Sequence, residues 1–317
     1  MILRNAMNSS NIANCVRTDN DIHDAVRSWC ANISDAETRY CNIRNWKTSE
    51  VTNMDALFAN FHQGYTPRSL GVNNQSADAF CDDRNFQGNI RSWDVSRVTS
   101  MSYMFANQHR FNSDLSRWDV GNVRNMMHMF RNAKLFSGNL SNWNVAKVTK
   151  MNSMFKNAEA FDSDLSRWNV GNVEQMGHMF QRTNRFNTDL SKWDVRNVTY
   201  MATMFYVATN FAQDLGDWKL NPNVETSTMF SYSRSECVLE RGGTPSTNER
   251  IITDSRFYCE DAECLHEEYE DQHNDDLADS VYRWANTEYD YDYNYGYVIT
   301  SSPFCRINIT LQKKVYA

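Results

Sequence analysis

The eight cysteines are the side chains of this sequence best suited to covalent chemistry, and they lie only near its two ends. No cysteine falls between residues 82 and 236. Redox and zinc enzymes more often hold cysteines in close pairs, whereas two separate sets of four are typical of disulfide-stapled caps in an oxidising compartment. The spacing of residues 259 and 264 leaves zinc binding as an alternative. We predict disulfides within each set, with the pairing open: Cys15, Cys30, Cys41 and Cys81, then Cys237, Cys259, Cys264 and Cys305.

Six Asn-x-Ser/Thr sequons predict the same oxidising compartment. They begin at Asn8, Asn32, Asn74, Asn139, Asn197 and Asn308, and chance accounts for several of them because the chain is rich in Asn, Ser and Thr. The first residues hold no apolar core of about 7–15 residues, so no signal peptide is visible. We expect an extracellular or cell-surface protein with attached N-glycans, whose leader is not in this numbering.

Acidic and amide side chains recur in two columns that are set by a repeated tryptophan. Asp and Asn interchange in both columns, which suits side chains that bond to the local backbone in turns. Carboxylates stacked about 5 Å apart repel one another, so calcium between the units is the alternative; otherwise we expect no cofactor. The first column contains Asn89, Asp114, Asn139, Asp164, Asp189 and Asp214, and the second contains Asp94, Asp119, Asn144, Asn169 and Asp194.

Histidines offer little for catalysis in this sequence. His128 and His178 share one column but lie two units apart, too far to share a metal at strand spacing, so we expect them on an exposed helix surface. His266 and His273 stand among acidic residues, where a metal site is the alternative to solvated surface. Neither G-x-S-x-G, H-E-x-x-H nor a P-loop pattern occurs, so we do not expect an enzyme.

Composition excludes two further classes of function. The chain has 317 residues, and its formal net charge of −7 offers no basic stripe for nucleic acid. No run of about 18 apolar residues is present, so we expect no membrane span. Protein partners, including further copies of the same chain, are the expectation that remains.

A unit of 25 residues recurs through the middle of the chain and must position the two acidic columns and the histidines at 128 and 178. An earlier unit has Trp46 and Met54-Leu57-Phe58 at the same offsets, and 22 extra residues, near 60–85, separate it from the next. The regular tryptophans are Trp93, Trp118, Trp143, Trp168, Trp193 and Trp218. Each is followed eleven residues later by a Met-Phe pair.

Two hydrophobic periodicities alternate within a unit. Val123, Met126, Met129, Phe130 and Ala133 follow helical spacing, whereas L-S-R-W-D-V reads as a short extended piece. This predicts an α/β repeat solenoid, a leucine-rich-repeat-like right-handed coil of short parallel strands and short helices with disulfide-stapled end caps. The tryptophans should form one buried ladder, and the Met-Phe column should be core, because a cofactor site would not repeat in every unit.

The predicted organisation has three parts. Residues 1–41 form an N-terminal cap with an amphipathic helix, in which Ile22, Ala25, Val26 and Trp29 share one side. Residues 42–230 form the seven-unit solenoid, whose last unit is atypical, as expected of a terminal repeat. Residues 231–317, rich in Cys, acid and Tyr, form a C-terminal cap or assembly tail.

The unit F-N-x-D-L-S-x-W-D-V-x-N-V-x-x-M-x-x-M-F resembles the repeat of BspA-like surface proteins, a relative of the leucine-rich repeat. The match runs from about residue 24 to residue 230, roughly two thirds of the chain. The resemblance implies an extracellular protein engaged in adhesion or assembly, as in bacterial surface lipoproteins and marine protists. The family pattern has no catalytic residues to transfer, and the tail lies outside it.

Two functions follow as hypotheses. The first is a non-catalytic structural protein that packs with copies of itself or with neighbours in a surface coat, hair or filament. The second is a recognition module that binds a glycan or a partner protein on the solenoid face. Aromatic and charged variation gathered on one face would favour recognition, whereas irregular segments at the ends favour assembly. The ends and the insertion are the irregular segments in the sequence, so it favours assembly.

The tail offers candidate assembly residues. An extended strand through E-Y-D-Y-D-Y-N-Y-G-Y would place five tyrosine rings on one face and acidic side chains on the other. Such a strand could cover the open end of the array, add to a neighbouring copy, or remain disordered. The five rings are those of Tyr289, Tyr291, Tyr293, Tyr295 and Tyr297.

Overall fold

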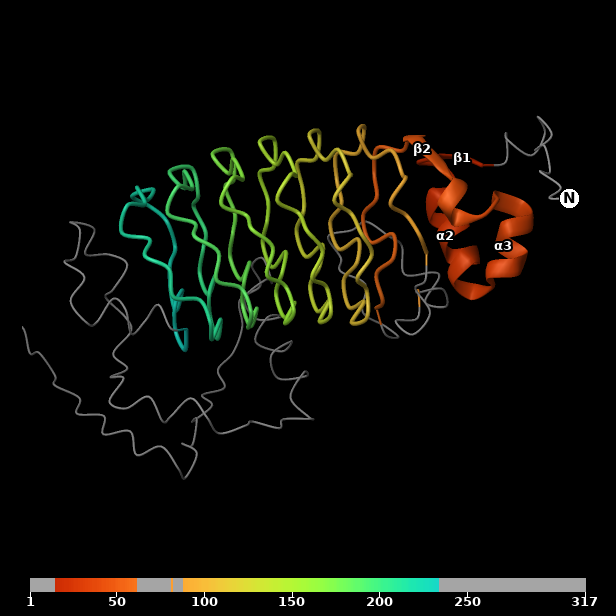
Figure 1. Ribbon diagram of the computed structural model, residues 1–317. Helices are drawn as coiled ribbons and strands as arrows, with labels where there is room; N and C mark the ends of the chain where they lie inside the picture. The colour runs from red at the N-terminus through yellow and green to blue at the C-terminus, as the bar shows by residue number, and fades with distance from the viewer. Residues whose placement is uncertain (1–14, 62–80, 82–87, 234–317) are drawn as a thin grey trace, which may run out of the picture. The chain divides into compact units, whose positions relative to one another are not determined.

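The computed structural model describes residues 15–61, residue 81 and residues 88–233 (Figure 1). Several predictions concern residues outside these ranges: the four C-terminal cysteines, the histidines at 266 and 273, the tail tyrosines and most of the insertion. The sequons at Asn8, Asn74 and Asn308 also lie outside the described residues.

The described chain begins with a short αβ cap. Strand β1 (Val16–Thr18) leads into helix α2 (Ile22–Ala31) and helix α3 (Ile33–Tyr40), and the 3-10 turn η1 (Ile43–Asn45) leads into strand β2 (Lys47–Glu50), which pairs in parallel with β1. Helix α2 is the predicted amphipathic helix, and its four predicted apolar residues are buried. Asn32 separates the helices: it is extended, and its side chain accepts the Asp35 N–H at 3.3 Å to cap α3.

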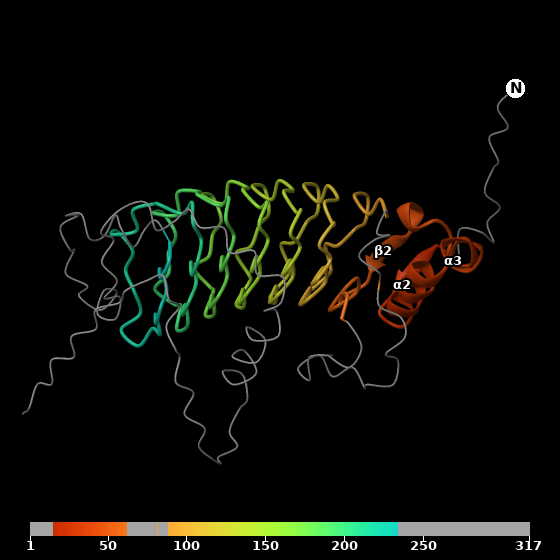
Figure 2. The ribbon, with the colours of Figure 1, turned by 90° about the horizontal axis from the view of Figure 1, so that it is seen from below.

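Beyond β2 the chain forms units that lie side by side, as Figures 1 and 2 show. Isolated parallel bridges join one residue of each unit to its counterpart in the next: Asn53, Ser100, Asn125, Lys150, Gln175, Tyr200 and Glu225. The Asn53–Ser100 bridge keeps the register across the insertion. Each of these units except the last donates four backbone N–H groups to the unit that follows; for example, the N–H groups of Met126 and His128 donate to the carbonyls of Lys150 and Asn152 at 3.0 and 2.9 Å. Further bonds run in the opposite direction, as from the Thr149 N–H to the Arg124 carbonyl at 2.9 Å.

Turns replace the helix that the apolar spacing predicts in each unit, and residues 88–233 contain no α-helix. In the unit of Trp118, the N–H of Met129 bonds only three residues back, to the carbonyl of Met126 at 3.3 Å. His128 and Asn132 have φ of 57° and 59°. This left-handed geometry interrupts a right-handed helix. The N–H groups of these two residues donate to the next unit, so the units gain their bonds from stacking.

Large apolar side chains fill the interior of the array. Every tryptophan of the 25-residue series is buried, with 2–3% of its surface exposed. The indole N–H groups donate to carbonyls in the preceding unit, as in Trp168 Nε1 to Leu140 O at 3.0 Å. The Trp168 ring lies tilted against Phe155, with centroids 6.4 Å apart, and the Trp46 and Trp93 rings stack at 5.7 Å.

Two columns of phenylalanine rings run along the core. Stacked rings in the first column lie 5.5–5.7 Å apart between centroids, and those of the second lie 5.7–6.0 Å apart. The first column contains Phe58, Phe105, Phe130, Phe155, Phe180, Phe205 and Phe230, and the second contains Phe111, Phe136, Phe161, Phe186 and Phe211. Spacing of this size suits offset stacking of aromatic rings, which stabilises each pair beyond the buried area.

Two disulfides join the four N-terminal cysteines to one another. Cys15 pairs with Cys41 across 26 residues, and Cys30 of α2 pairs with Cys81 across 51 residues. The first bridge ties the residue before β1 to the end of α3. The second ties the cap to the insertion, so both bridges restrict the unfolded chain around the N-terminal end of the array.

Candidate interaction face

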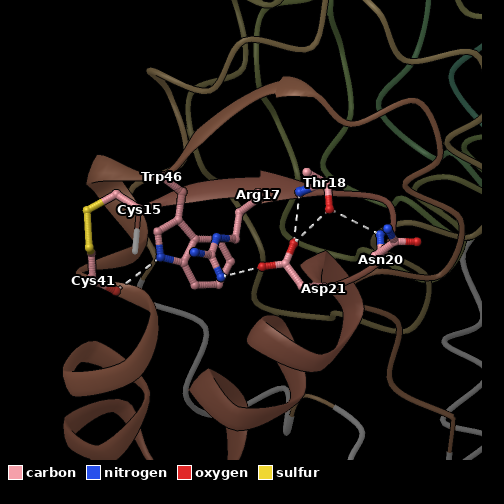
Figure 3. Close-up of polar contacts among 7 residues, drawn as sticks. All are labelled: Cys15, Arg17, Thr18, Asn20, Asp21, Cys41 and Trp46. Atoms are coloured by element: carbon pink, nitrogen blue, oxygen red, sulfur yellow. Dashed lines mark hydrogen bonds and ion pairs between the residues drawn. A yellow bond between two sulfur atoms is a disulfide. The ribbon is translucent and has the colours of Figure 1, made fainter. Parts of the chain in front are cut away.

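A polar cluster in the N-terminal cap has a structural role (Figure 3). The Arg17 guanidinium lies over the rings of Tyr40 and Trp46, 5.0 and 5.5 Å from their centroids, and pairs with Asp21 at 2.8 Å. Burial lowers the pKa of Arg17, and Asp21 opposes this shift. Asp21 also accepts the Thr18 N–H at 2.8 Å. The cluster therefore fixes β1 against α2 and β2.

The two acidic columns bond to their own turns. Asp114 Oδ1 accepts the Ser116 N–H at 2.9 Å, and Asn139 Oδ1 accepts the Ser141 N–H at the same distance. Hydrogen bonds from Ser116 lower the pKa of Asp114. A carboxylate and an amide oxygen fill the same role, which explains why Asp and Asn interchange. In the ranges that the structure describes, no group of three His, Cys, Asp or Glu side chains is placed to hold a metal ion.

One side of the array carries side chains that differ from unit to unit, and we call it the variable face. Its residues range from buried, as His128 and Ser153 are, to exposed, as Arg182 is. It consists of the residues ten, thirteen and fourteen positions after each of the six tryptophans from Trp93 to Trp218. In these six units, the residues at positions ten and fourteen have positive φ. The residues at positions eleven and twelve, between them, belong to the core. The face contains Tyr103, Ala106, Asn107, His128, Arg131, Asn132, Ser153, Lys156, Asn157, His178, Gln181, Arg182, Thr203, Tyr206, Val207, Thr228, Ser231 and Tyr232.

The variable face is cationic and partly aromatic. Its charged residues are Arg131, Lys156 and Arg182, and the segments 102–108, 127–133, 152–158, 177–183, 202–208 and 227–233 contain no Asp or Glu. Arg131 and Lys156 are 9% and 5% exposed, whereas Arg182 is exposed. The Tyr206 and Tyr232 rings meet edge to face at 5.5 Å. A positive face thus lies on a chain whose net charge is negative.

The histidines of this face are not the exposed helix residues that the sequence suggests. His128 is 1% exposed and stacks on Tyr103, with ring centroids 4.2 Å apart. Burial, and then the charges of Arg131 and Lys156, hold the pKa of His128 well below its usual value. Burial, reinforced by Lys156, lowers the pKa of His178 to about 4. Both rings are therefore neutral at pH 7.

An asparagine ladder borders the variable face at position fourteen. The Asn132 amide donates to Asn107 Oδ1 at 2.6 Å, and the Asn157 amide donates to Asn132 Oδ1 at the same distance. These residues have φ of 58–60°, which Asn tolerates better than most side chains. Arg182 takes the next place, so the neutral ladder changes there to a cationic and aromatic surface.

The remaining predicted sites are scattered over the described surface. Asn32, Asn139 and Asn197 are all exposed, and the structure does not bring them together. The variable face was not predicted from the sequence. The signal was available, because positions ten and thirteen change in chemical type between units while the Met-Phe pair between them stays the same.

Comparison with known proteins gives one family. The family model described as "Mycoplasma protein of unknown function, DUF285" matches residues 24–65, 71–166 and 136–238. Neither the curated proteins nor the solved structures contain a match. Within the described ranges, no helix is long and apolar enough to cross a membrane.

Proposed function

This chain belongs to the DUF285 family, and we propose that it is a non-catalytic extracellular recognition protein that binds carboxylate-bearing segments of a partner protein on its variable face. We propose further that the array is a leucine-rich-repeat-like, right-handed solenoid of the BspA-like kind. The long W-D-V-x-N-V-x-x-M-x-x-M-F unit and the parallel bridges between units support this fold assignment.

The concentration of side-chain variety on one face carries the proposal. The core columns repeat the same Trp, Met and Phe in unit after unit, because stacking constrains them. Position ten instead varies among Tyr, His, Ser and Thr, and position thirteen varies among Ala, Arg, Lys, Gln, Tyr and Ser. Stacking of the core columns does not require this variety. A repeat array that binds a particular partner requires it.

The chemistry of the face suits carboxylates. A guanidinium binds a carboxylate through two parallel hydrogen bonds, and Arg and Tyr are enriched among the residues that dominate binding energy. Arg131 and Lys156 are largely buried, so they contribute positive potential to the face, and the exposed Arg182 is the guanidinium that a carboxylate can reach. Burial raises the pKa of Tyr206, and the charge of Arg182 opposes this shift. Arg182 gives the face an exposed anchor.

The test is binding of a polyglutamate peptide to the full chain. We expect Arg131→Gln with Lys156→Gln to weaken binding at least tenfold, because both cations lie on the face. The matched control, Arg117→Gln with Arg167→Gln, removes the same charge from exposed positions on another column and should change affinity less than twofold. Equal losses in the two variants would show only a general charge effect and would overturn the proposal. Binding of a sulfated glycan in place of polyglutamate would favour glycan recognition.

Assembly with further copies is the second candidate, and the last unit supports it. Leu220, Val224 and Phe230 are only partly buried, and Tyr232 is 54% exposed. An apolar end of this kind can be covered by another chain. Light scattering across a range of concentrations tests this candidate: a mass that stays at one chain at all concentrations would reject it.

A further inference from the structure

Backbone bonds that run toward the N-terminal end of the array follow one pattern in the five units from Trp93 to Trp193. The residue six positions after the tryptophan donates its N–H to the carbonyl of the residue at the same position in the preceding unit. Arg124 donates in this way to Thr99 at 2.8 Å, and Thr149 donates to Arg124 at 2.9 Å. Where the donor is a threonine, its hydroxyl donates to the same carbonyl, as Thr149 Oγ1 does at 3.3 Å.

The side chain of Asp19 supplies this acceptor for the first unit, which has no unit before it. Asp19 directly follows strand β1. Its Oδ1 accepts the Thr52 N–H at 2.7 Å, and its Oδ2 accepts the Thr52 hydroxyl. Its Oδ1 also accepts the Asn53 N–H at 3.0 Å, much as the Arg124 carbonyl accepts the Lys150 N–H at 3.4 Å. One carboxylate therefore makes the three bonds that a carbonyl of a preceding unit would make.

His23, on helix α2, supplies a donor to the same end. Within the array, the N–H at position ten donates to the carbonyl at position nine of the next unit, as Tyr103 does to Met127 at 2.8 Å. The carbonyl at position nine of the first unit belongs to Asp55, and His23 Nε2 lies 3.0 Å from it. Nε2 carries the proton in this bond, because a carbonyl can only accept. His23 therefore takes the place of a backbone N–H from a preceding unit.

The apolar side of α2 completes the same end of the core. Ile22, Val26 and Trp29 belong to one buried cluster with Trp46 and Met54 of the first unit. The cap thus covers the apolar surface of the first unit and also bonds to its backbone. Backbone N–H and carbonyl groups at an open edge of this kind are a template on which a strand of another chain can pair.

We infer that Asp19 and His23 act as side-chain substitutes for a missing repeat unit and close the N-terminal edge of the array against strand addition by a second copy. The inference is independent of the variable face. It restricts the second candidate function, because copies of the intact chain would have to assemble through a surface other than this edge.

Amide hydrogen exchange on the full chain tests the bonds made by these side chains. The Thr52 and Asn53 N–H groups should exchange slowly, like that of Thr99, because each is bonded. Asp19→Ala should speed their exchange about tenfold or more, whereas Asp19→Asn keeps an acceptor oxygen and should keep most of the protection. Asp24→Ala removes the same charge from an exposed position on α2, and as the matched control it should change exchange less than about twofold.

Light scattering over a range of concentrations tests the consequence for assembly. The full chain with Asp19→Ala and His23→Ala should gain mass beyond that of the unaltered chain as concentration rises, because its edge is open. The matched control, Asp24→Ala with Arg27→Ala, should keep the mass of the unaltered chain. The Ala25 N–H, which donates to the Asp21 carbonyl at 2.8 Å, reports by its exchange whether the cap stays folded.

Three results would overturn the inference. The first is exchange of the Thr52 and Asn53 N–H groups in the unaltered chain at the rate of exposed groups. The second is an equal effect of Asp19→Ala and Asp19→Asn, or of Asp19→Ala and its control, on that exchange. The third is an unchanged mass for the double variant with its cap folded. If the double variant unfolds the cap, Asp19→Ala with His23→Gln, which keeps a donor at residue 23, provides the milder perturbation.

Discussion

Replacing Trp168 with alanine tests the packing of the array at its centre. The side chain is 3% exposed, its ring lies against Phe155, and its Nε1 donates to the Leu140 carbonyl at 3.0 Å. Loss of a buried indole and the cavity it leaves costs about 3–5 kcal/mol. Of this, about 1 kcal/mol belongs to the hydrogen bond. We expect a loss near the upper end of this range, because Leu140 is fully buried and its carbonyl loses a donor.

Urea denaturation followed by far-ultraviolet circular dichroism measures this loss. Trp168→Phe keeps one six-membered aromatic ring but removes the five-membered ring with its N–H donor, so it should cost less than Trp168→Ala, about 1–3 kcal/mol. Lys192→Ala, at an exposed position, is the surface control and should lie within about 0.5 kcal/mol of the parent chain. Because each unit contacts only its neighbours, Trp168→Ala should broaden the transition as well. A loss under about 1 kcal/mol for Trp168→Ala would refute the packing argument.

Three further outcomes are expected. Gly177→Ala should destabilise the chain by about 1–3 kcal/mol in thermal unfolding, because the added Cβ would lie 2.0 Å from the Tyr200 ring, and Tyr200→Ser should relieve it. Stability should fall as pH falls from about 6.5 to about 4, since the unfolded chain takes up protons that His128 and His178 in the fold resist; His178→Gln should reduce this dependence, and the part due to His128 should remain. Removing the Cys30–Cys81 bridge with paired alanines should cost about 2–4 kcal/mol in urea.

The 25-residue period predicts the core well. Every tryptophan of the series, and the Met-Phe pairs up to Met204-Phe205, are buried as the repeat requires. Identical residues at one offset can only stack on one another if the units repeat in space, so the period alone identifies the buried columns. The amphipathic helix α2 is equally clear, because its four apolar residues follow helical spacing over a whole element.

The local conformation within a unit could not be predicted from the same pattern. Apolar residues three and four apart suit a helix, but they also suit consecutive turns with a left-handed residue in each. His128 and Asn132 decide between these conformations through their backbone angles, which hydrophobic spacing does not report. The burial of His128 was missed for the same reason: the ring of Tyr103, one unit away, covers it only in the stacked array.

Mapping a polyglutamate peptide onto the isotopically labelled full chain by nuclear magnetic resonance tests the central claim most directly. We expect chemical-shift changes centred on Lys156, His178 and Arg182, with none at Arg117 and Lys192 on the other exposed column. The changes should weaken as salt concentration rises, since ion pairs carry the contact. Shifts centred on Arg117 and Lys192, or no shifts at low salt, would contradict the assignment of the variable face as the binding surface.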